Sequence, residues 1–323
     1  MKFKKDYIWP IIGVAAVVFS VWLLLEQLKD ISYDDLVISF YAVPLHNWIM
    51  ALVCTCFSFI ALAGYDQLAL RHLRRRVSFL FVSATSFTTY ALAHNIGASV
   101  VSGALVRYRA YTSKGLSAAQ VGVLVAFCSF TFTLSSISLG GLVLLFNPDL
   151  LNHFLPDFPR WGSYALAILM LGLVGLYVGG SALRLPAIKI RNFRLEYPRL
   201  RIVWQQLIIG PLEILSAAGI IYFALPVESN PGFVVVLGIF LASFSAALLS
   251  HAPGGLGVLE VMFFLALPEI NQADLLAALL IFRVFYFLIP LAISIVIVVL
   301  FERAQLMERL SRAAEKITNT LNP

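Results

Sequence analysis

Ionisable side chains inside long apolar stretches are the residues of this sequence best suited to chemistry. Asp66, Glu213, Glu260 and Arg283 each lie in such a stretch. A charge in a hydrocarbon environment is costly, so it is commonly paired or functional. Two interpretations remain open: a structural ion pair, either Glu260–Arg283 or Glu213–Arg283, and a site for a charged headgroup or a proton. Because three acids share one base, at least one acid lacks a basic partner.

Two polar interruptions break the apolar pattern, and each begins with a histidine. Proline lacks an amide proton and glycine weakens a helix, so both interruptions are expected to end a helix. Either histidine can titrate near neutral pH or bond the free backbone groups of a helix end. The glycines either form a tight turn or direct amide protons toward an anion such as a lipid phosphate. The interruptions are His94-Asn95-Ile96-Gly97 and His251-Ala252-Pro253-Gly254-Gly255-Leu256-Gly257.

Eight apolar segments are expected to position these residues. Hydrophobic residues make up 60% of the chain and charged residues 12%, which indicates a membrane protein. A helix needs about 20 residues to cross the hydrocarbon of a bilayer. The two segments that are too long for one crossing are those that contain the interruptions. The segments are 7–28, 46–70, 77–106, 118–146, 162–183, 203–225, 233–267 and 273–301.

The basic residues lie between the apolar segments and predict how the chain crosses the membrane. Lys and Arg gather on the cytoplasmic side of membrane proteins. Clusters precede the first segment and follow the second, third, fifth and eighth. They share one side only if the third and seventh segments are helix–break–helix hairpins that return to the side they enter from. The prediction is an all-α, polytopic helical membrane protein with about six full spans, two re-entrant hairpins of opposite orientation and cytoplasmic termini.

This order of segments is similar to an inverted-topology repeat, a transporter architecture in which broken helices meet near the midplane. Arg107 and Arg109 follow the first hairpin at the predicted inner interface, where they either pair with lipid phosphates or anchor the chain. Residues 1–301 form the predicted membrane domain, and residues 302–323 a predicted amphipathic helix on the cytoplasmic surface. The net charge of +6 follows from the basic clusters without nucleic acid as a partner.

Four runs of residues together resemble a known family. In their order along the chain they resemble the membrane domain of the bacterial lysylphosphatidylglycerol synthetase/flippase family, the multiple peptide resistance factors and their stand-alone relatives. The resemblance extends from about residue 10 to residue 301. The runs are AGYDQLAL at 63–70, VRYRAY at 106–111 with GLS at 115–117, PGGLGVLE at 253–260 and RVFYFLIP at 283–290.

The resemblance implies a lipid flippase of the bacterial plasma membrane. Such a protein moves aminoacylated phosphatidylglycerol from the inner to the outer leaflet, which lowers the binding of cationic antimicrobial peptides. Full-length members of the family also carry a cytosolic synthase domain that uses aminoacyl-tRNA. This chain ends about 20 residues after its last apolar segment, so neither the synthase nor enzymatic aminoacyl transfer is expected.

The predicted function is translocation of a phospholipid between the leaflets of the bacterial plasma (inner) membrane. The substrate is aminoacylated phosphatidylglycerol or another anionic or zwitterionic lipid. The alternatives are an ion-coupled transporter of a small solute, and a membrane-embedded enzyme or scaffold of lipid synthesis. A lateral groove open to lipid favours the flippase, and a closed, water-filled vestibule favours the solute transporter. An acid, a base and a nucleophile within hydrogen-bond reach favour the enzyme.

Membrane phospholipids are the expected partners. A homo-oligomer and a separate lipid-synthesis enzyme remain open as partners, and no nucleic acid, cofactor or metal is expected. The cysteines show no metal-ligand pattern beyond one C-x-C pair and are expected to pack in the apolar runs. The residues expected to form the substrate-binding and translocation site are Tyr65, Asp66, His94, Asn95, Arg107, Arg109, Glu213, His251, Pro253, Gly254, Gly255, Gly257, Glu260 and Arg283.

Overall fold

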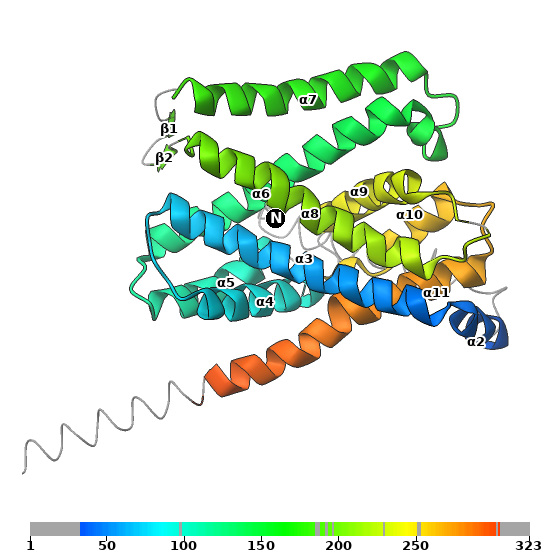
Figure 1. Ribbon diagram of the computed structural model, residues 1–323, viewed down its shortest axis with the longest axis horizontal. Coiled ribbons are helices and arrows are strands. Elements are labelled where there is room, and N and C mark those ends of the chain that lie inside the picture. Colours follow the sequence, from blue (N-terminus) through cyan, green and yellow to red (C-terminus); the bar gives the residue numbers. More distant parts are fainter. Residues whose placement is uncertain are drawn as a thin grey trace, which may run out of the picture.

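The computed structural model is a bundle of long helices (Figure 1). It describes residues 33–96, 99–184, 188–190, 193–195, 197–228, 230–250, 253–301 and 303. The predicted first segment, 7–28, and His251 lie outside the described residues. The predicted tail helix, 302–323, also lies outside them except for residue 303.

The helices follow the predicted apolar segments closely, with additional short elements between them. The two strands, β1 and β2, form an antiparallel pair in the connection after α7. The elements in chain order are α2 (Tyr33–Ala42), α3 (Leu45–His72), α4 (Phe79–Ile96), α5 (Ser99–Thr112), α6 (Ala118–Phe146), the 3-10 helix η2 (Pro148–His153), α7 (Arg160–Ala182), β1 (Ile188–Ile190), β2 (Phe193–Leu195), α8 (Leu200–Ala224), α9 (Phe233–Ser250), the 3-10 helix η3 (Pro253–Gly255), α10 (Val258–Ala266), α11 (Gln272–Arg283) and the π-helix η4 (Val284–Leu288).

Six helices are long and apolar enough to cross a membrane, which confirms the predicted helical, polytopic fold class. They are α3, α6, α7, α8, α9 and the helix that runs from Gln272 through η4 to Phe301. The six are not the predicted six, because the first predicted span lies outside the described residues and α9 was expected to be half of a hairpin. At 18 residues, α9 meets the length of a span by itself.

Local sequence explains where the main helices begin and end. Ser117 accepts a hydrogen bond from the Gln120 amide and Gln120 bonds back to the Ser117 amide, so α6 starts with a capping box. Prolines 44 and 159 directly precede α3 and α7, where a missing amide proton costs nothing. The bundle is tightly packed at its centre, because α8 approaches α6 so closely that a Cβ on Gly210 would overlap the Ser135 hydroxyl.

At each of the two predicted breaks, two helices pack against each other. Residues 97 and 98 connect α4 to α5, which pack against each other, and α9 packs against α10 on either side of η3. The hairpins lie at opposite ends of the long axis of the bundle, and their tips meet midway (Figure 1). At this junction a Cβ on Gly254 would lie 3.8 Å from the carbonyl oxygen of His94. That the hairpins re-enter a bilayer from opposite faces remains a prediction.

One predicted boundary is wrong and matters for the site. The third apolar segment was expected to end at residue 106, with Arg107 and Arg109 beyond it at the membrane interface. Instead α5 continues to Thr112, and both arginines belong to the helix. Helices buried against protein tolerate polar residues on their inner face, so hydropathy alone ends them too early.

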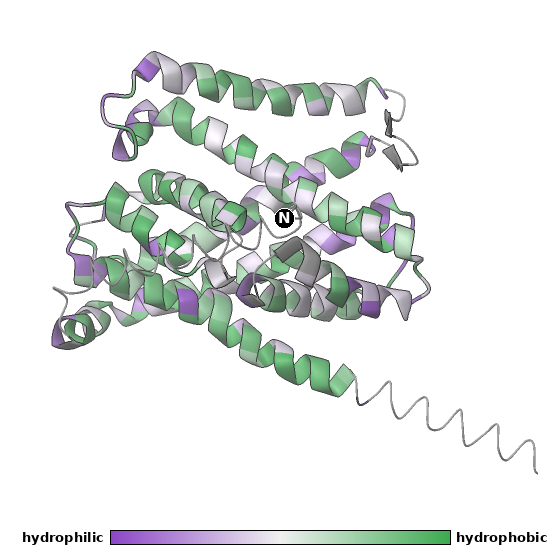
Figure 2. Ribbon diagram, turned by 180° about the vertical axis from the view of Figure 1, so that it is seen from behind, coloured by the Kyte–Doolittle hydropathy of each residue, from purple (hydrophilic) through white to green (hydrophobic). Residues whose placement is uncertain are grey.

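The connections divide into two groups at the two ends of the bundle. Those that join α3 to α4, α5 to α6 and α7 to α8 lie at one end, and those after α6, α8 and α10 lie at the other (Figure 1). Hydrophilic residues gather at these ends while hydrophobic residues cover the helices between them (Figure 2). The first group carries the basic clusters of the sequence, which agrees with the pattern used to predict the topology.

Candidate functional site

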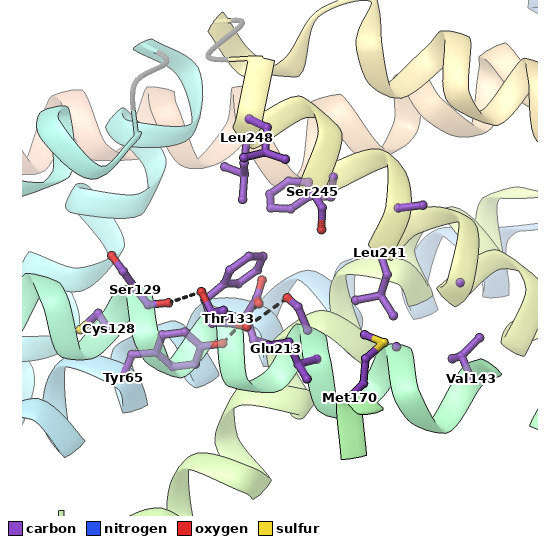
Figure 3. Close-up of a pocket in the computed structure, with 18 of the residues that line it drawn as sticks. Tyr65, Cys128, Ser129, Thr133, Val143, Met170, Glu213, Leu241, Ser245 and Leu248 are labelled. Atoms are coloured by element: carbon purple, nitrogen blue, oxygen red, sulfur yellow. Dashed lines mark hydrogen bonds between the residues drawn. The ribbon is translucent and has the colours of Figure 1, made fainter. Parts of the chain in front are cut away.

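A cavity of ≈ 670 Å³ lies inside the bundle between α6 and α9. Its size is typical of a site for a small organic molecule or part of a lipid. Residues of α6 line it from Val125 to Leu144, about five helical turns. Figure 3 shows Ser129 of α6 and Tyr65 of α3 at one end of the cavity and Val143 of α6 at the other, with Leu241, Ser245 and Leu248 of α9 opposite α6.

The lining changes from polar to apolar along the cavity. Six ionisable side chains line it together with a row of α6 hydroxyls: Tyr65, Tyr90, His94, Arg107, Cys128 and Glu213. The hydroxyls also bond their own helix, since Thr133 donates to the Ser129 carbonyl at 3.1 Å and Ser136 to the Phe132 carbonyl at 3.0 Å. The remaining lining is apolar and includes Val143, Leu150, Phe154, Leu166, Leu241 and Leu248.

Several lining residues are exposed on the side of the bundle. Leu166 of α7 is 38% exposed and Leu249 of α9 is 76% exposed, and Thr133 of α6 is also exposed. These residues belong to helices of spanning length. The cavity therefore has a lateral mouth between α6, α7 and α9 on the surface that faces lipid in a spanning bundle.

A buried ion pair closes the polar part of the cavity between α3 and α5. Arg107 donates from Nη2 to Asp66 Oδ1 at 2.6 Å and from Nε to both carboxylate oxygens at 3.2 Å. Asp66 also accepts from the Tyr111 hydroxyl at 2.7 Å and from the Cys128 thiol at 3.4 Å. The guanidinium lies over the Tyr90 ring, 4.8 Å from its centroid. This arrangement satisfies both charges, as burial requires.

Glu213 of α8 has a different environment. It is 2% exposed and lines the cavity wall beside Tyr65 (Figure 3). Its carboxylate accepts from the hydroxyls of Tyr286 at 2.7 Å, Ser58 at 3.5 Å and Tyr65 at 3.5 Å. Within the described part of the chain no basic side chain forms an ion pair with it. Glu213 is thus the acid that the sequence leaves without a base.

A second buried ion pair holds the loop of the α9–α10 hairpin. Arg283 pairs with Glu260 and also donates to the carbonyls of Gly254 at 3.0 Å and Gly255 at 3.4 Å. Glu260 in turn accepts from the Gly257 amide at 3.0 Å and so caps its own helix. Of the two pairings that the sequence leaves open for Arg283, the structure therefore contains the one with Glu260. This pair holds the loop against the start of η4.

The π-helix η4 orients several groups that contact the site residues. Pro290 cannot donate to the carbonyl of Tyr286, and the Ile289 amide instead bonds Val284, five residues earlier. The displaced turn presents Tyr286 to Glu213 and leaves the Phe287 carbonyl to accept from Asn95 Nδ2 at 3.2 Å. The His94 ring stacks on Tyr286 with centroids 5.4 Å apart. Both interruptions of the sequence thus contact the same stretch of the last helix.

Comparison with known proteins identifies the family. A family model described as the lysylphosphatidylglycerol synthase TM region matches residues 11–294. The chain belongs to this family. It is similar to the uncharacterized protein slr0712 of Synechocystis, with 28% identity over 87% of each chain. It is also similar to the inner membrane protein YbhN of Escherichia coli, with 28% identity over 76% of this chain and 77% of the relative.

The family also includes parts of larger proteins. The phosphatidylglycerol lysyltransferase of Staphylococcus aureus is 24% identical over 91% of this chain, and the match covers 34% of that protein. This chain therefore spans about a third of the length of the lysyltransferases it matches. Membership of the family confirms the resemblance drawn from the four sequence runs and the assignment as a multi-pass membrane protein.

The structure places the predicted site residues in three groups. Tyr65, His94, Arg107 and Glu213 line the cavity, and Asp66 holds Arg107 from behind. The second group, at the junction of the two hairpins, consists of Asn95, Gly254, Gly255, Gly257, Glu260 and Arg283. Pro253 begins η3 in this group, and His251 lies outside the described residues.

Arg109 forms the third group and lies apart from the cavity. Arg109 is exposed near the end of α5, whereas Arg107 is 5% exposed and directed into the bundle. Residues two apart on a helix face different directions, so Arg109 does not join Arg107 at the cavity. The glycine loop also differs from an anion site, because the Gly254 and Gly255 carbonyls face Arg283 and the Gly257 amide bonds Glu260.

Several functional candidates were missing from the predicted site. Tyr111 follows Arg107 by four residues, so one helical turn places both on Asp66, and this spacing was a usable signal. Tyr286 lies within the run RVFYFLIP but carried no signal of its own contact with Glu213. Ser58 and Tyr90 contact the site from α3 and α4 and are inconspicuous in apolar segments.

Proposed function

We propose that this protein translocates a phospholipid between the leaflets of a bacterial inner membrane. The observation that carries the proposal is the amphipathic cavity with its lateral mouth. A phospholipid has the same division into a charged headgroup and apolar chains. The polar part of the cavity matches the headgroup, and the mouth between α6, α7 and α9 leaves the acyl chains in the surrounding lipid.

The cavity lowers the main barrier to lipid movement. A charged headgroup cannot enter hydrocarbon cheaply, at a cost of several kcal/mol or more for an unpaired charge. In the proposed path the α6 hydroxyls and the side chains of Tyr65, Arg107 and Glu213 replace the lost water. Guanidinium groups bind phosphate oxygens well, so Arg107 is the proposed phosphate contact. The junction of the two hairpin tips supplies non-helical backbone beside this path, which spanning bundles tolerate next to a wet cavity.

Phosphatidylglycerol and its aminoacyl derivatives are the first candidate substrates. Support comes from the family description and from relatives named phosphatidylglycerol lysyltransferase. The proposed orientation places the basic connections and both termini in the cytoplasm. The lateral mouth also favours a lipid over a small dissolved solute, since a solute site would be expected to open along the bundle axis.

A reconstitution experiment tests this function. Purified protein is placed in vesicles that contain one tail-labelled phospholipid at a time, with phosphatidylglycerol, lysylphosphatidylglycerol and phosphatidylethanolamine headgroups. The fraction of label accessible to a membrane-impermeant quencher is followed over time. The proposal expects at least one headgroup to equilibrate faster than in protein-free vesicles. Equal rates with and without folded protein for every headgroup would overturn it.

A further inference from the structure

Glu213 differs from the other two buried acids in what surrounds it. Asp66 and Glu260 are both buried, and each bonds an arginine. Glu213 is equally buried yet bonds three hydroxyls. An uncompensated carboxylate is strongly disfavoured at such a position, whereas a neutral carboxylic acid is not. The acid without a basic partner is also the one that lines the cavity.

The hydroxyl surroundings can serve both charge states of Glu213. A hydroxyl both donates and accepts, and its hydrogen rotates to suit its neighbour. Tyr286 donates to the carboxylate at 2.7 Å in the charged state. In the neutral state the carboxylic acid can donate to the Ser58 or Tyr65 oxygen, both 3.5 Å away. An arginine partner would hold only the charged state, so the shell of Glu213 suits a group that changes charge.

The nearby charged groups on the elements packed around Glu213 are already paired, so none of them holds its carboxyl group in one charge state. The closest guanidinium among the lining residues, that of Arg107, is held by Asp66. Arg283 is held by Glu260, and α9 contains no titratable residue. The other titratable groups around the site are Tyr65 on α3, Tyr90 and His94 on α4, Cys128 on α6, Tyr177 on α7 and Tyr286 on η4.

We infer that Glu213 binds and releases a proton at the cavity wall, and that this proton couples lipid movement to the proton gradient. The inference rests on the proposed function. Glu213 takes a proton from water in the cavity while the cavity is open to one side of the membrane. It releases the proton to water on the other side, so that one proton crosses for each headgroup moved. The cavity is large enough for water, and the α6 hydroxyls give such water polar partners.

A lipid assay with an imposed pH gradient tests the coupling. With one proton per lipid, a gradient of one pH unit supports about a tenfold difference in lipid concentration between the leaflets. Wild-type protein is expected to approach this asymmetry, and with Glu213→Gln the distribution of lipid between the leaflets is expected not to change with the gradient. Glu269→Gln is the matched control, because Glu269 is an exposed acid in the connection after α10. It is expected to behave as the wild type.

The outcomes separate the coupling from the lipid function. If wild-type protein moves lipid but ignores the gradient, or if Glu213→Gln still responds to it, the coupling is wrong and the lipid function stands. If no lipid moves with or without a gradient, the lipid function is wrong and the coupling falls with it.

A spectroscopic measurement reads Glu213 directly. Infrared difference spectra between acidic and alkaline pH should contain a carboxylic-acid C=O band in the wild type and in Glu269→Gln. The part of the band that belongs to Glu213 should be lost in Glu213→Gln and displaced in Tyr286→Phe, which removes the shortest hydrogen bond. A spectrum of Glu213→Gln that matches the wild type would show that Glu213 does not change charge and would overturn the inference.

Discussion

At the scale of single residues, the buried ion pairs do more than neutralise charge. Asp66 accepts from three side chains on two helices, and Arg283 bonds a carboxylate and two backbone carbonyls. Each pair therefore joins separate elements of the chain. Removal of one partner leaves the other both charged and unsatisfied, which is the costly case for a buried pair.

The first prediction compares a buried pair with an exposed one. Asp66→Ala is expected to lower the free energy of unfolding by about 3–5 kcal/mol, because it strands the buried Arg107 guanidinium. Asp149→Ala breaks the Arg160–Asp149 pair, whose side chains are 70% and 46% exposed, and should cost far less. Thermal unfolding of the purified variants in one detergent measures both. Equal losses would mean that Arg107 finds another partner or water.

The second prediction concerns exchange of the charges in the other pair. Arg283→Ala and Glu260→Ala are each expected to destabilise by about 3–5 kcal/mol. The double variant Arg283→Glu with Glu260→Arg restores opposite charges but should recover little. A glutamate at 283 cannot donate to the Gly254 and Gly255 carbonyls, and an arginine at 260 cannot accept from the Gly257 amide. A double-mutant cycle on unfolding measures this, and near-complete recovery would show that charge alone matters.

The sequence predicts the residues of the site better than their partners. Membrane-depth acids and bases were recognisable from type and position, and one of the two alternatives for Arg283 is present. The Asp66–Arg107 pair was not foreseen, because Arg107 follows the end of the apolar run and reads as an interfacial residue. Glu213 has no basic partner because Arg107 and Arg283 pair with other acids. Which acid each arginine contacts depends on how the helices pack, which the sequence does not show.

At the scale of elements, the glycines of η3 shape the junction of the hairpins. Gly254 and Gly255 adopt φ of 61° and 62°, where other residues are strained. Their surroundings differ, however. The nearest atom to an added Cβ at Gly254 is 3.7 Å away, whereas a Cβ at Gly255 would lie 2.8 Å from that of Ala247 on α9.

The third prediction follows from this difference. Gly254→Ala should cost about 1–2 kcal/mol, the price of the left-handed backbone alone. Gly115→Ala is a control with φ of 81° and open space, and should cost a similar amount. Gly255→Ala should cost clearly more, since the clash shifts the end of α9. Unfolding measurements on the three variants test this ranking, which fails if Gly255→Ala is no worse than Gly115→Ala.

Element breaks were more predictable than element chemistry. Helices end at or close to both predicted interruptions, and the predicted span 118–146 coincides with α6. Neither α2, the short strands nor the π-helix was predicted. The π-helix depends on Pro290 inside an apolar run, a residue that signals some disturbance of the helix but does not indicate which kind.

At the scale of the whole molecule, the two groups of connections make a topological prediction. Single cysteines at Arg76 and Ser113 should be labelled from the cytoplasm, and one at Glu228 from outside, in a background without Cys54, Cys56 and Cys128. All three positions are exposed. The first two belong to the connections from α3 to α4 and from α5 to α6, which lie at the same end of the bundle (Figure 1). Impermeant thiol reagents on intact cells and inverted vesicles provide the measurement. External labelling at position 113 would contradict the predicted orientation.

Hydropathy and charge predict the spans because each segment must by itself be apolar over the width of the bilayer and carry its basic residues on the cytoplasmic side. They carry no information on which helices touch, so the cavity could not be anticipated. The cavity depends on α7 remaining apart from α9 while both contact α6. Its mouth arises from that separation, and the last prediction tests whether lipid uses it.

Ala242 of α9 lines the cavity opposite α6, and its replacement by Trp should fill the path. Gly172→Trp is the control, because Gly172 is exposed on α7 and an added Cβ there meets no atom within 4 Å. We expect Ala242→Trp to lose most of the lipid translocation rate in vesicles and Gly172→Trp to retain it, since the bulk of the indole is the same in both. Unfolding temperatures of the two variants establish that both remain folded. Full activity of a folded Ala242→Trp protein would place the lipid path outside the cavity.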